Sequence, residues 1–392
     1  MVKKLFYIFI FLLLAVNLFS ETKLQIAQNL FYKNKIESLK LFSEIANDEN
    51  SSSETLLECA KAFLKNHDAK TALQILEKEN RVLNSEEYVY VKALCYIELG
   101  KENEALPLLQ SIKQKEFIGF ANYYSGMIFQ RQGKFEQAYF CFEKASEQLN
   151  NINFSKEAVY ESAVCAMEAN WIEKGIEKAE KFISIAYEEN QKIRAVNLLS
   201  DLYIENSNYE KCEKMLLPLS KKADMLGKVA LFKLGILYGK KGELEKADDA
   251  WSLYCFRFKN YEDVDEAFFR RAEIWYVAKN WKKAVELFNS FKNDFPKSKF
   301  FEIALFYLTD ALFKNNEINR SFLLAQEFLK RFPESIYKFQ VKINCVDIYQ
   351  EKEDYESALK LLKQIIKEFP EHIDYYNLRK IEKNLEKLIL KD

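Results

Sequence analysis

The sequence predicts an all-α protein, a solenoid of about ten helix-turn-helix repeats closed by a C-terminal capping helix. Three observations support this fold class. The 392 residues include only 9 Gly and 5 Pro, which are too few breakers for a β-fold with many turns. A short motif recurs along the chain, and apolar residues at helical spacing flank its copies. A single helical hairpin cannot bury its own apolar face, so such hairpins are expected to stack around one continuous core.

The recurring motif opens with polar or turn-forming residues, usually continues with an aromatic residue and ends with a small one. The small residue serves as a register mark. The marks are Leu39, Ala72, Ala105, Ala138, Gly175, Cys212, Ala247, Ala284, Ser321 and Ala358. Their intervals are 33, 33, 33, 37, 37, 35, 37, 37 and 37 residues. This spacing predicts one solenoid over residues 21–370, in which each unit has a helix A and then a helix B that carries the mark.

Other positions recur in register with the marks. A small residue stands twelve positions before most marks, and a bulky residue stands four positions after several of them. The small residues are Ala60, Ala93, Gly126, Ala163, Ser200, Gly235 and Ala272, and the bulky ones are Leu76, Leu109, Phe142, Trp251, Phe288 and Leu362. Pro296, Pro333 and Pro370 end the last three units. Over residues 24 to about 370, this pattern resembles the tetratricopeptide repeat family, whose unit has ~34 residues. The resemblance implies a right-handed superhelix that binds other proteins.

The last three units share a 37-residue spacing and a Phe-Pro boundary, which is followed by Lys-Ser, Glu-Ser or Glu-His. In these respects they are similar to the tetratricopeptide units of bacterial envelope proteins of the Tol-Pal coordinator and outer-membrane assembly type. This similarity implies a role in the cell envelope.

Two prolines fall inside expected B helices. Pro107 lies two residues after a mark, and we expect it in the first turn of its helix, where proline is tolerated. Pro218 lies six residues after Cys212 and predicts a kink or an early helix end.

Residues 371–392 follow the last repeat and form the expected capping helix. Leu378, Ile381, Leu385 and Leu388 share one helical face there. A short coiled-coil stretch that binds a partner is the alternative.

Residues 1–20 have the composition of an export signal. Lys3 and Lys4 precede an apolar run of 12 residues from Leu5 to Val16, which is shorter than the ~20 residues of a membrane-spanning helix. We expect a signal peptide cleaved after Ser20, with an uncleaved anchor as the alternative. Both alternatives predict a body outside the cytoplasm, either free in the periplasm or held at the inner membrane and facing the periplasm. Membrane contact is then expected only through this segment, if it is uncleaved.

The composition gives little support for nucleic-acid binding, cofactors or catalysis. The 58 basic and 59 acidic residues leave no basic surplus for phosphate contacts. His67 and His372 are far apart, and the seven cysteines include no CxxC pair, so no metal or cofactor site is expected. We interpret the cysteines as small buried hydrophobic residues. Known catalytic and phosphate-binding motifs are missing, which predicts a protein that is not an enzyme.

Helix A lines the concave face in the family that this chain resembles, so a candidate partner-binding groove can be placed by register. The position fifteen before the mark is aromatic in six units, at Tyr90, Tyr123, Tyr160, Phe232, Phe269 and Phe306. Eleven before the mark come Asp201, Glu273, Asp310 and Asp347, an expected acidic lining for a basic ligand. The alternatives are an aromatic column in the core between repeats, if the register is shifted by one residue, and an acidic column on a solvated helix face.

The predicted function is a non-catalytic scaffold outside the cytoplasm that binds a protein or peptide in bacterial envelope assembly or maintenance. The alternative is an envelope module for a non-protein ligand such as a cell-wall glycan or a lipid, because an aromatic groove can also stack against sugars.

Overall fold

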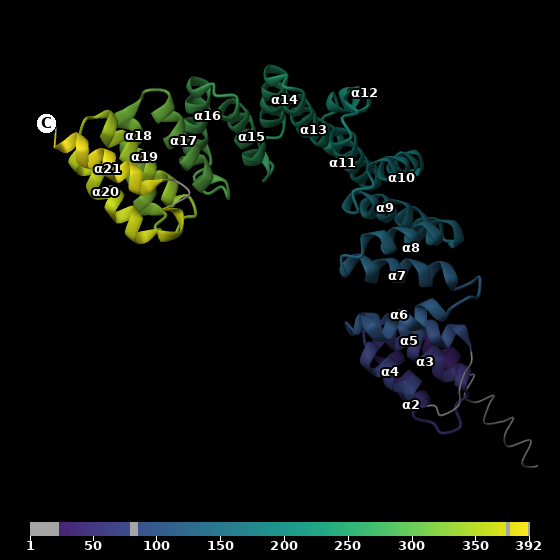
Figure 1. The fold of residues 1–392 in the computed structure, drawn as a ribbon. Helices are drawn as coiled ribbons and strands as arrows, with labels where there is room; N and C mark the ends of the chain where they lie inside the picture. Colours follow the sequence, from purple (N-terminus) through teal and green to yellow (C-terminus); the bar gives the residue numbers. More distant parts are fainter. Residues whose placement is uncertain (1–22, 79–84, 374–376, 391–392) are drawn as a thin grey trace, which may run out of the picture. The chain divides into compact units, whose positions relative to one another are not determined.

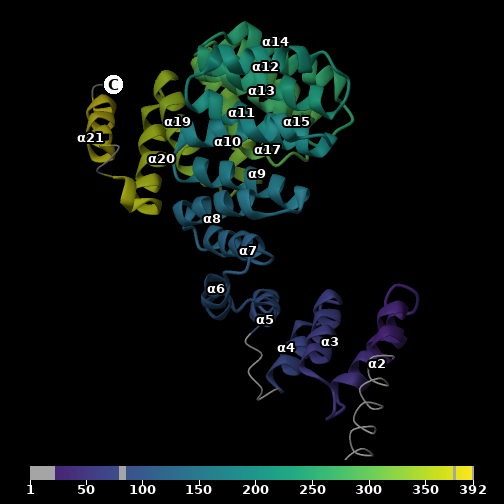
Figure 2. The same ribbon diagram turned by 90° about the vertical axis from the view of Figure 1, so that its right-hand side faces the viewer.

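The computed structural model describes residues 23–78, 85–373 and 377–390, and all regular secondary structure in these ranges is helical. The expected signal segment, residues 1–20, lies outside the described residues. The chain divides into two compact units, residues 1–191 and residues 192–392. Within each unit the helices follow one another in chain order (Figures 1 and 2). Among the described residues, no helix has both the length and the apolar character needed to cross a membrane.

Residues 23–30 are helical and precede the numbered helices of the first unit. These are α2 (Lys35–Ala46), α3 (Ser53–Lys65), α4 (Ala69–Glu77), α5 (Glu86–Glu98), α6 (Glu102–Ser111), α7 (Ile118–Arg131), α8 (Phe135–Gln148), α9 (Ile152–Glu168) and α10 (Ile172–Ile185). Helix α11 (Glu189–Glu205) begins just before the boundary of the second unit. It is followed by α12 (Tyr209–Ser220), α13 (Met225–Lys241), α14 (Leu244–Arg257), α15 (Val264–Val277), α16 (Trp281–Asp294), α17 (Phe301–Lys314), α18 (Ile318–Arg331), α19 (Lys338–Glu351), α20 (Tyr355–Glu368), the short 3-10 helix η1 (Pro370–His372) and α21 (Leu378–Ile389).

The predicted helix-turn-helix register is confirmed from the second repeat onward. Odd-numbered helices from α3 to α19 are A helices, and even-numbered helices from α4 to α20 are B helices. Each mark from Ala72 to Ala358 is the fourth residue of its B helix and is buried. In the first repeat the expected mark is wrong by one residue. The fourth residue of α2 is Ser38, which is fully buried, whereas Leu39 is half-buried.

Polar residues at the mark are accommodated by hydrogen bonds to helix A. The hydroxyl of Ser321 donates to the carbonyl oxygen of Thr309 at 2.7 Å. The hydroxyl of Ser38 donates to the carbonyl oxygen of Ala27 at 2.6 Å. Both hydroxyls are buried, and an unpaired buried hydroxyl is unfavourable. Serine therefore fits at the crossing only because a backbone acceptor lies opposite.

The two helices of a repeat cross closely where small residues meet bulky ones. A Cβ atom at Gly126 would lie 2.9 Å from the ring of Phe142, and a Cβ atom at Gly235 would lie 2.3 Å from the ring of Trp251. Each bulky residue is the one four positions after the mark. The small residue on helix A therefore makes room for a large ring on helix B, which explains the recurring pair.

The turn between the two helices has the same strained position in nine repeats. The residue five before the mark has a positive φ in each. These residues are His67, Gly100, Gly133, Asn170, Ser207, Gly242, Lys279, Asn316 and Glu353. Only three are glycine, although the left-handed conformation is unfavourable for other residues. The turn geometry is thus imposed by the packing of the two helices.

The Phe-Pro boundaries explain how the last repeats connect. Helices α16, α18 and α20 end one residue before the phenylalanine, since the following proline disfavours a helical conformation there. The hydroxyl of Ser298 donates to Asp265 at 2.6 Å and accepts the amide of Phe300 at 3.0 Å. Ser335 does the same with Glu302, at 2.5 Å, and the amide of Tyr337, at 3.0 Å. We call this arrangement the serine clasp. It joins the first turn of one A helix to the residues just before the next A helix.

At the third boundary His372 takes the place of the serine. Its ring centroid lies 4.3 Å from that of Phe339, so an aromatic contact replaces the clasp. His372 therefore lies in η1, ahead of the terminal helix. Helix α21 packs against α20 through the fully buried side chains of Leu378 and Leu385.

One of the two expectations about proline in B helices is confirmed. Helix α12 ends two residues after Pro218 and has 12 residues, whereas α14, α16, α18 and α20 have 14 each. Pro107 was expected in the first turn of its helix. It is instead the sixth residue of α6, a helix of only 10 residues. Its ring prevents the usual hydrogen bond to the carbonyl four residues earlier, at residue 103.

We expect Gly235→Ala to lower the free energy of unfolding by about 1–3 kcal/mol, because the new methyl group overlaps the ring of Trp251. Gly239→Ala is the matched control in the same helix, since a Cβ atom there meets nothing closer than 3.9 Å. It is expected to stabilise the protein by about 0.5–1 kcal/mol. Urea unfolding followed by circular dichroism measures both, and equal effects would contradict the close crossing.

We expect Lys279→Gly to raise the free energy of unfolding by about 0.5–1 kcal/mol, because glycine adopts the positive φ of 61° without strain. Lys279→Ala removes the same side chain and keeps the strain, so it should give no gain. The same unfolding measurement applies. A gain for both variants would point to the lysine side chain and not to the backbone.

Candidate partner-binding groove

The structure places the aromatic column between the repeats. The clearest case is Phe269, which is only 2% exposed. It stacks on Phe300 at a centroid distance of 4.9 Å and on Tyr307 at 6.1 Å. Phe306 repeats this arrangement by stacking on Tyr337 at 4.7 Å. The expectation that Phe269 faces a partner is therefore wrong, because this register position points toward the next A helix.

The other members of the column are half-buried and contact neighbouring rings. Tyr90 lies 5.5 Å from Phe117, Tyr123 lies 5.4 Å from Phe154 and Tyr160 lies 5.1 Å from Phe182, all between ring centroids. These contacts join consecutive helices and repeats. The column thus contributes mainly to packing between repeats, and only one of its members, Phe232, lines the pocket described next.

A pocket of about 580 Å³ lies between α13 and α15, and we call it the α13–α15 pocket. Its lining includes the apolar residues Phe232, Ile236, Trp251, Ile274 and Val277. Val277, at the C-terminal end of α15, is 72% exposed. The charged residues of the lining are Lys240, Glu266, Arg270 and Glu273.

The expected site residues Phe232 and Glu273 therefore meet in one pocket. Sequence reasoning missed Ile236 and Val277. Their signal was present, since they stand eleven and seven positions before their marks, on the same helical face as Glu273.

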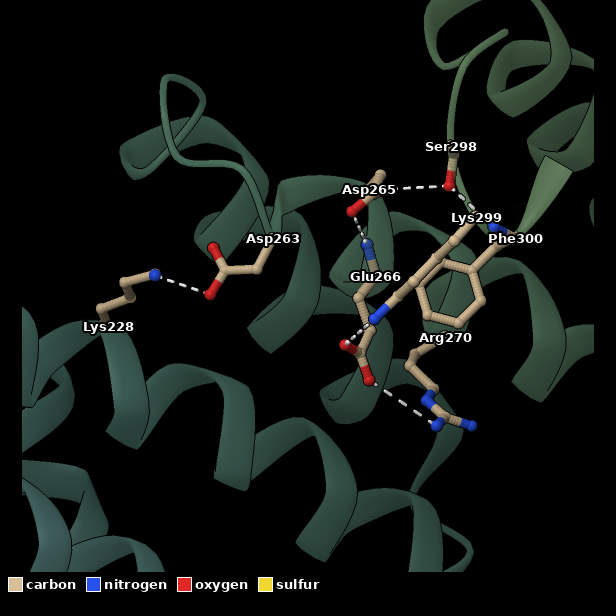
Figure 3. Close-up of polar contacts among 8 residues, drawn as sticks. All are labelled: Lys228, Asp263, Asp265, Glu266, Arg270, Ser298, Lys299 and Phe300. Atoms are coloured by element: carbon tan, nitrogen blue, oxygen red, sulfur yellow. Dashed lines mark hydrogen bonds and ion pairs between the residues drawn. The ribbon is translucent and has the colours of Figure 1, made fainter.

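A polar network borders the start of α15 (Figure 3). Glu266 lies between Lys299, at 3.9 Å, and Arg270, at 3.7 Å. Its carboxylate faces both cations in Figure 3. Asp263 pairs with the buried Lys228 at 2.6 Å. Glu266 and Asp263 are thus already matched by basic side chains of the same chain.

The acidic column divides into paired and unpaired members. Asp201 pairs with Lys233 at 2.6 Å, and Glu273 pairs with Arg270 at 2.8 Å. Asp310 accepts hydrogen bonds from the hydroxyl of Tyr276, at 2.8 Å, and from the side-chain amide of Asn344, at 3.2 Å.

Asp347 accepts only a long bond from the side-chain amide of Gln350, at 3.4 Å. In the part of the chain that the structure describes, Asp310 and Asp347 form no ion pair. No basic side chain among the described residues therefore pairs directly with either carboxylate.

Two carboxylates, the buried Asp248 and the half-buried Asp347, respond to their surroundings in opposite directions. Burial raises the pKa of Asp347, and the negative charges of Glu351 and Asp310 add to the effect, while Lys314 opposes it. Burial also opposes ionisation of Asp248. There the hydrogen bonds from Lys283 and Arg271 outweigh burial, so the pKa of Asp248 is lowered. The two carboxylates differ because Asp248 forms ion pairs with two cations and Asp347 forms none.

The side chains most often used in catalysis lie in structural settings. All seven cysteines are free thiols, five of them buried, and burial raises the pKa of Cys59, Cys95, Cys165 and Cys212 to about 12. His67 lies in the turn between α3 and α4, as expected, with its ring exposed beside Glu98. Within the described ranges no group of three or more His, Cys, Asp and Glu side chains is arranged to hold a metal ion.

We expect Asp347→Asn and Asp248→Asn to change stability in opposite directions at pH 7. When folding raises a carboxyl pKa, the group's contribution to the free energy of unfolding is present at low pH and lost as the pH rises. Asp347→Asn should therefore stabilise the protein by up to about 1 kcal/mol. When folding lowers a carboxyl pKa, the group's contribution to the free energy of unfolding is present at neutral pH and lost on acidification. Asp248→Asn should therefore destabilise the protein by about 1–3 kcal/mol.

Urea unfolding at pH 7 and at about pH 3 tests both variants, because each difference should shrink at the lower pH, where the carboxyls become protonated. A difference that persists unchanged at low pH would contradict the electrostatic explanation.

Comparison with protein families finds three matching segments. Residues 12–112 match the family described as anaphase-promoting complex, cyclosome, subunit 3. Residues 261–336 match the family described as outer membrane lipoprotein. Residues 347–372 match a tetratricopeptide repeat family. The second match contains α15, α17 and one wall of the α13–α15 pocket.

Two curated relatives are similar over part of the chain. The mitochondrial protein MSS2 of Saccharomyces cerevisiae is 30% identical over 34% of this chain and 40% of its own length. The BBSome complex member BBS4 homolog of Drosophila melanogaster is 26% identical over 45% of this chain and 37% of its own length. The chain thus spans about two fifths of the length of each relative.

Among solved structures, a signal transduction ATPase with numerous domains from Pyrococcus horikoshii carries a tetratricopeptide repeat sensor. It matches 90% of this chain and 55% of its own, with a TM-score of 0.50 and 15% identity, a likeness of fold alone. Together with the family matches and the repeating crossing geometry, this likeness confirms the resemblance inferred from the sequence. The chain is an all-α solenoid of tetratricopeptide-like repeats.

Proposed function

We propose that this chain is a non-catalytic scaffold outside the cytoplasm, which binds a protein partner at the α13–α15 pocket during bacterial envelope assembly or maintenance. The observation that carries the proposal is the pocket itself. It combines an apolar lining and the exposed side chain of Val277 with charged residues at its edge. Such a surface suits a partner that inserts apolar side chains and is oriented by polar ones.

Two further observations support the envelope setting. Part of the pocket lies in residues 261–336, which match the outer membrane lipoprotein family. The first twenty residues have the basic start and short apolar run of an export signal. The same segment accounts for either alternative, release into the periplasm or retention at the inner membrane.

The geometry favours binding over catalysis. Burial keeps most of the thiols in the protonated, unreactive form. The carboxylates around the pocket are mostly held in ion pairs with Arg270 and Lys299, where they act as structural partners. An acid or base in catalysis needs instead a free position beside a bound substrate.

The glycan alternative required an open row of aromatic rings. Phe269 is buried and Phe306 stacks on Tyr337, so these rings do not offer their faces to a sugar. The protein-binding proposal is therefore preferred, and a non-protein ligand becomes an outcome of the test.

We expect a photoreactive amino acid in place of Val277 to give a discrete protein adduct on irradiation of living cells, identified by mass spectrometry. Val277 is suitable because it lines the pocket and is 72% exposed. The matched control is the same replacement at Leu323, which is 65% exposed on the B helix α18.

The proposal predicts an adduct at position 277 that position 323 does not form. No protein adduct at 277, with the variant folded and exported, would contradict it. Adducts to lipid or wall material in place of protein would support the non-protein alternative.

A further inference from the structure

We propose that the partner contacts this protein through an extended basic segment, which lies across the A helices α15, α17 and α19 next to the α13–α15 pocket. The inference deepens the proposed function and rests on it. We define the acidic face as the residues at 18, 14, 11 and 7 positions before the mark, which share one side of each A helix. These residues are Glu266, Arg270, Glu273 and Val277 on α15, Ile303, Tyr307, Asp310 and Lys314 on α17, and Gln340, Asn344, Asp347 and Glu351 on α19.

The acidic face has a local charge imbalance that the whole chain lacks. It contains five acidic and two basic residues, whereas the full sequence is almost balanced. At the position eleven before the mark, acidic residues occur only from the sixth repeat onward. In the second to fifth repeats the residues eleven before the mark are Lys61, Leu94, Met127 and Val164. A surface with this charge favours a basic partner and repels nucleic acid or an anionic lipid surface.

The two carboxylates without an ion pair are Asp310, on the middle helix α17, and Asp347, on α19, the helix of this face farthest from the pocket. Tyr276 and Asn344 each donate to a different oxygen of Asp310. These neutral donors fix the carboxylate without cancelling its charge, and each oxygen keeps a lone pair for a further donor. Asp347 has only the amide of Gln350 at 3.4 Å. A lysine or arginine side chain of a partner would supply the charged hydrogen bond that both aspartates lack.

The spacing of the A helices sets the spacing of the basic residues. The bonds from Tyr276 and Asn344 to Asp310 show that neighbouring A helices meet along this face. Packed helices lie about 8–10 Å apart, and a segment in the extended polyproline II conformation rises about 3.1 Å per residue, with every third side chain on the same side. A segment that crosses the helices therefore meets Glu273, Asp310 and Asp347 with about every third side chain. An apolar residue at one end of the segment fits the α13–α15 pocket, beside Glu273.

The test uses the purified full chain and two fluorescein-labelled synthetic peptides of the same length, measured by fluorescence anisotropy. Both peptides have one leucine-phenylalanine pair followed by three charged positions at every third residue. These positions are lysine in one peptide and glutamate in the other. We expect the lysine peptide to bind at least about tenfold more tightly, and its binding to weaken as salt is added.

The decisive variant is Asp310→Asn with Asp347→Asn, which removes both charges at nearly constant shape. It should weaken binding of the lysine peptide by about three- to thirtyfold. The matched control is Glu286→Gln with Glu356→Gln, which removes two charges from exposed positions on B helices and should leave binding unchanged. Urea unfolding of both double variants shows whether either has lost stability.

Equal affinity for the two peptides, binding of neither peptide, or equal effects of the two double variants would overturn the basic-segment inference. These outcomes are distinct from failure of the proposed function. An adduct at position 277 together with unchanged binding by the Asp310 and Asp347 double variant would leave the pocket as a protein-binding site and remove only the role of charge.

Discussion

The close crossing of helix A over helix B is the constraint on which the other features of this protein depend. The helices can approach closely because the residue at the mark on helix B is small and faces helix A. Four residues later, a large side chain on helix B fills the space beside a small residue of helix A. Gly126 with Phe142 and Gly235 with Trp251 show the tightest form of this exchange. Once the crossing is fixed, every other side chain on helix A has a defined direction. The positive φ in the turn follows from the same constraint.

The sequence alone was sufficient to predict the repeats, because the mark recurs at nearly constant spacing and needs no tertiary information to be found. It failed in the first repeat for a physical reason. Choosing Ser38 over Leu39 requires knowing that the carbonyl of Ala27 will accept the buried hydroxyl, which no local pattern reveals. Pro107 was misplaced by a turn because helix ends depend on caps and packing that spacing does not specify.

The candidate site was harder to predict than the fold. Successive residues on a helix differ in direction by about 100°, so one position separates Phe269 in the core from Arg270 at the pocket. Both columns recur with the period of the repeat, and periodicity therefore cannot tell which one is open. Charge was equally ambiguous from sequence. Asp248 and Asp347 are both aspartates on predicted helices, yet only the structure shows that Asp248 forms ion pairs with two cations and Asp347 with none.

The serine clasps have a consequence for how the acidic face presents itself. In a solenoid each repeat is stabilised mainly by its immediate neighbours, so the distance between repeats can vary wherever those contacts are weak. Ser298 and Ser335 join α15 to α17 and α17 to α19 near the N-terminal ends of these helices, which are the three helices that carry the acidic face. The clasps add a side-chain bond between neighbouring repeats that fixes the spacing of these three helices. The acidic face therefore presents its carboxylates at fixed intervals. Whether a ligand fits depends on the order of its residues more than on its overall composition.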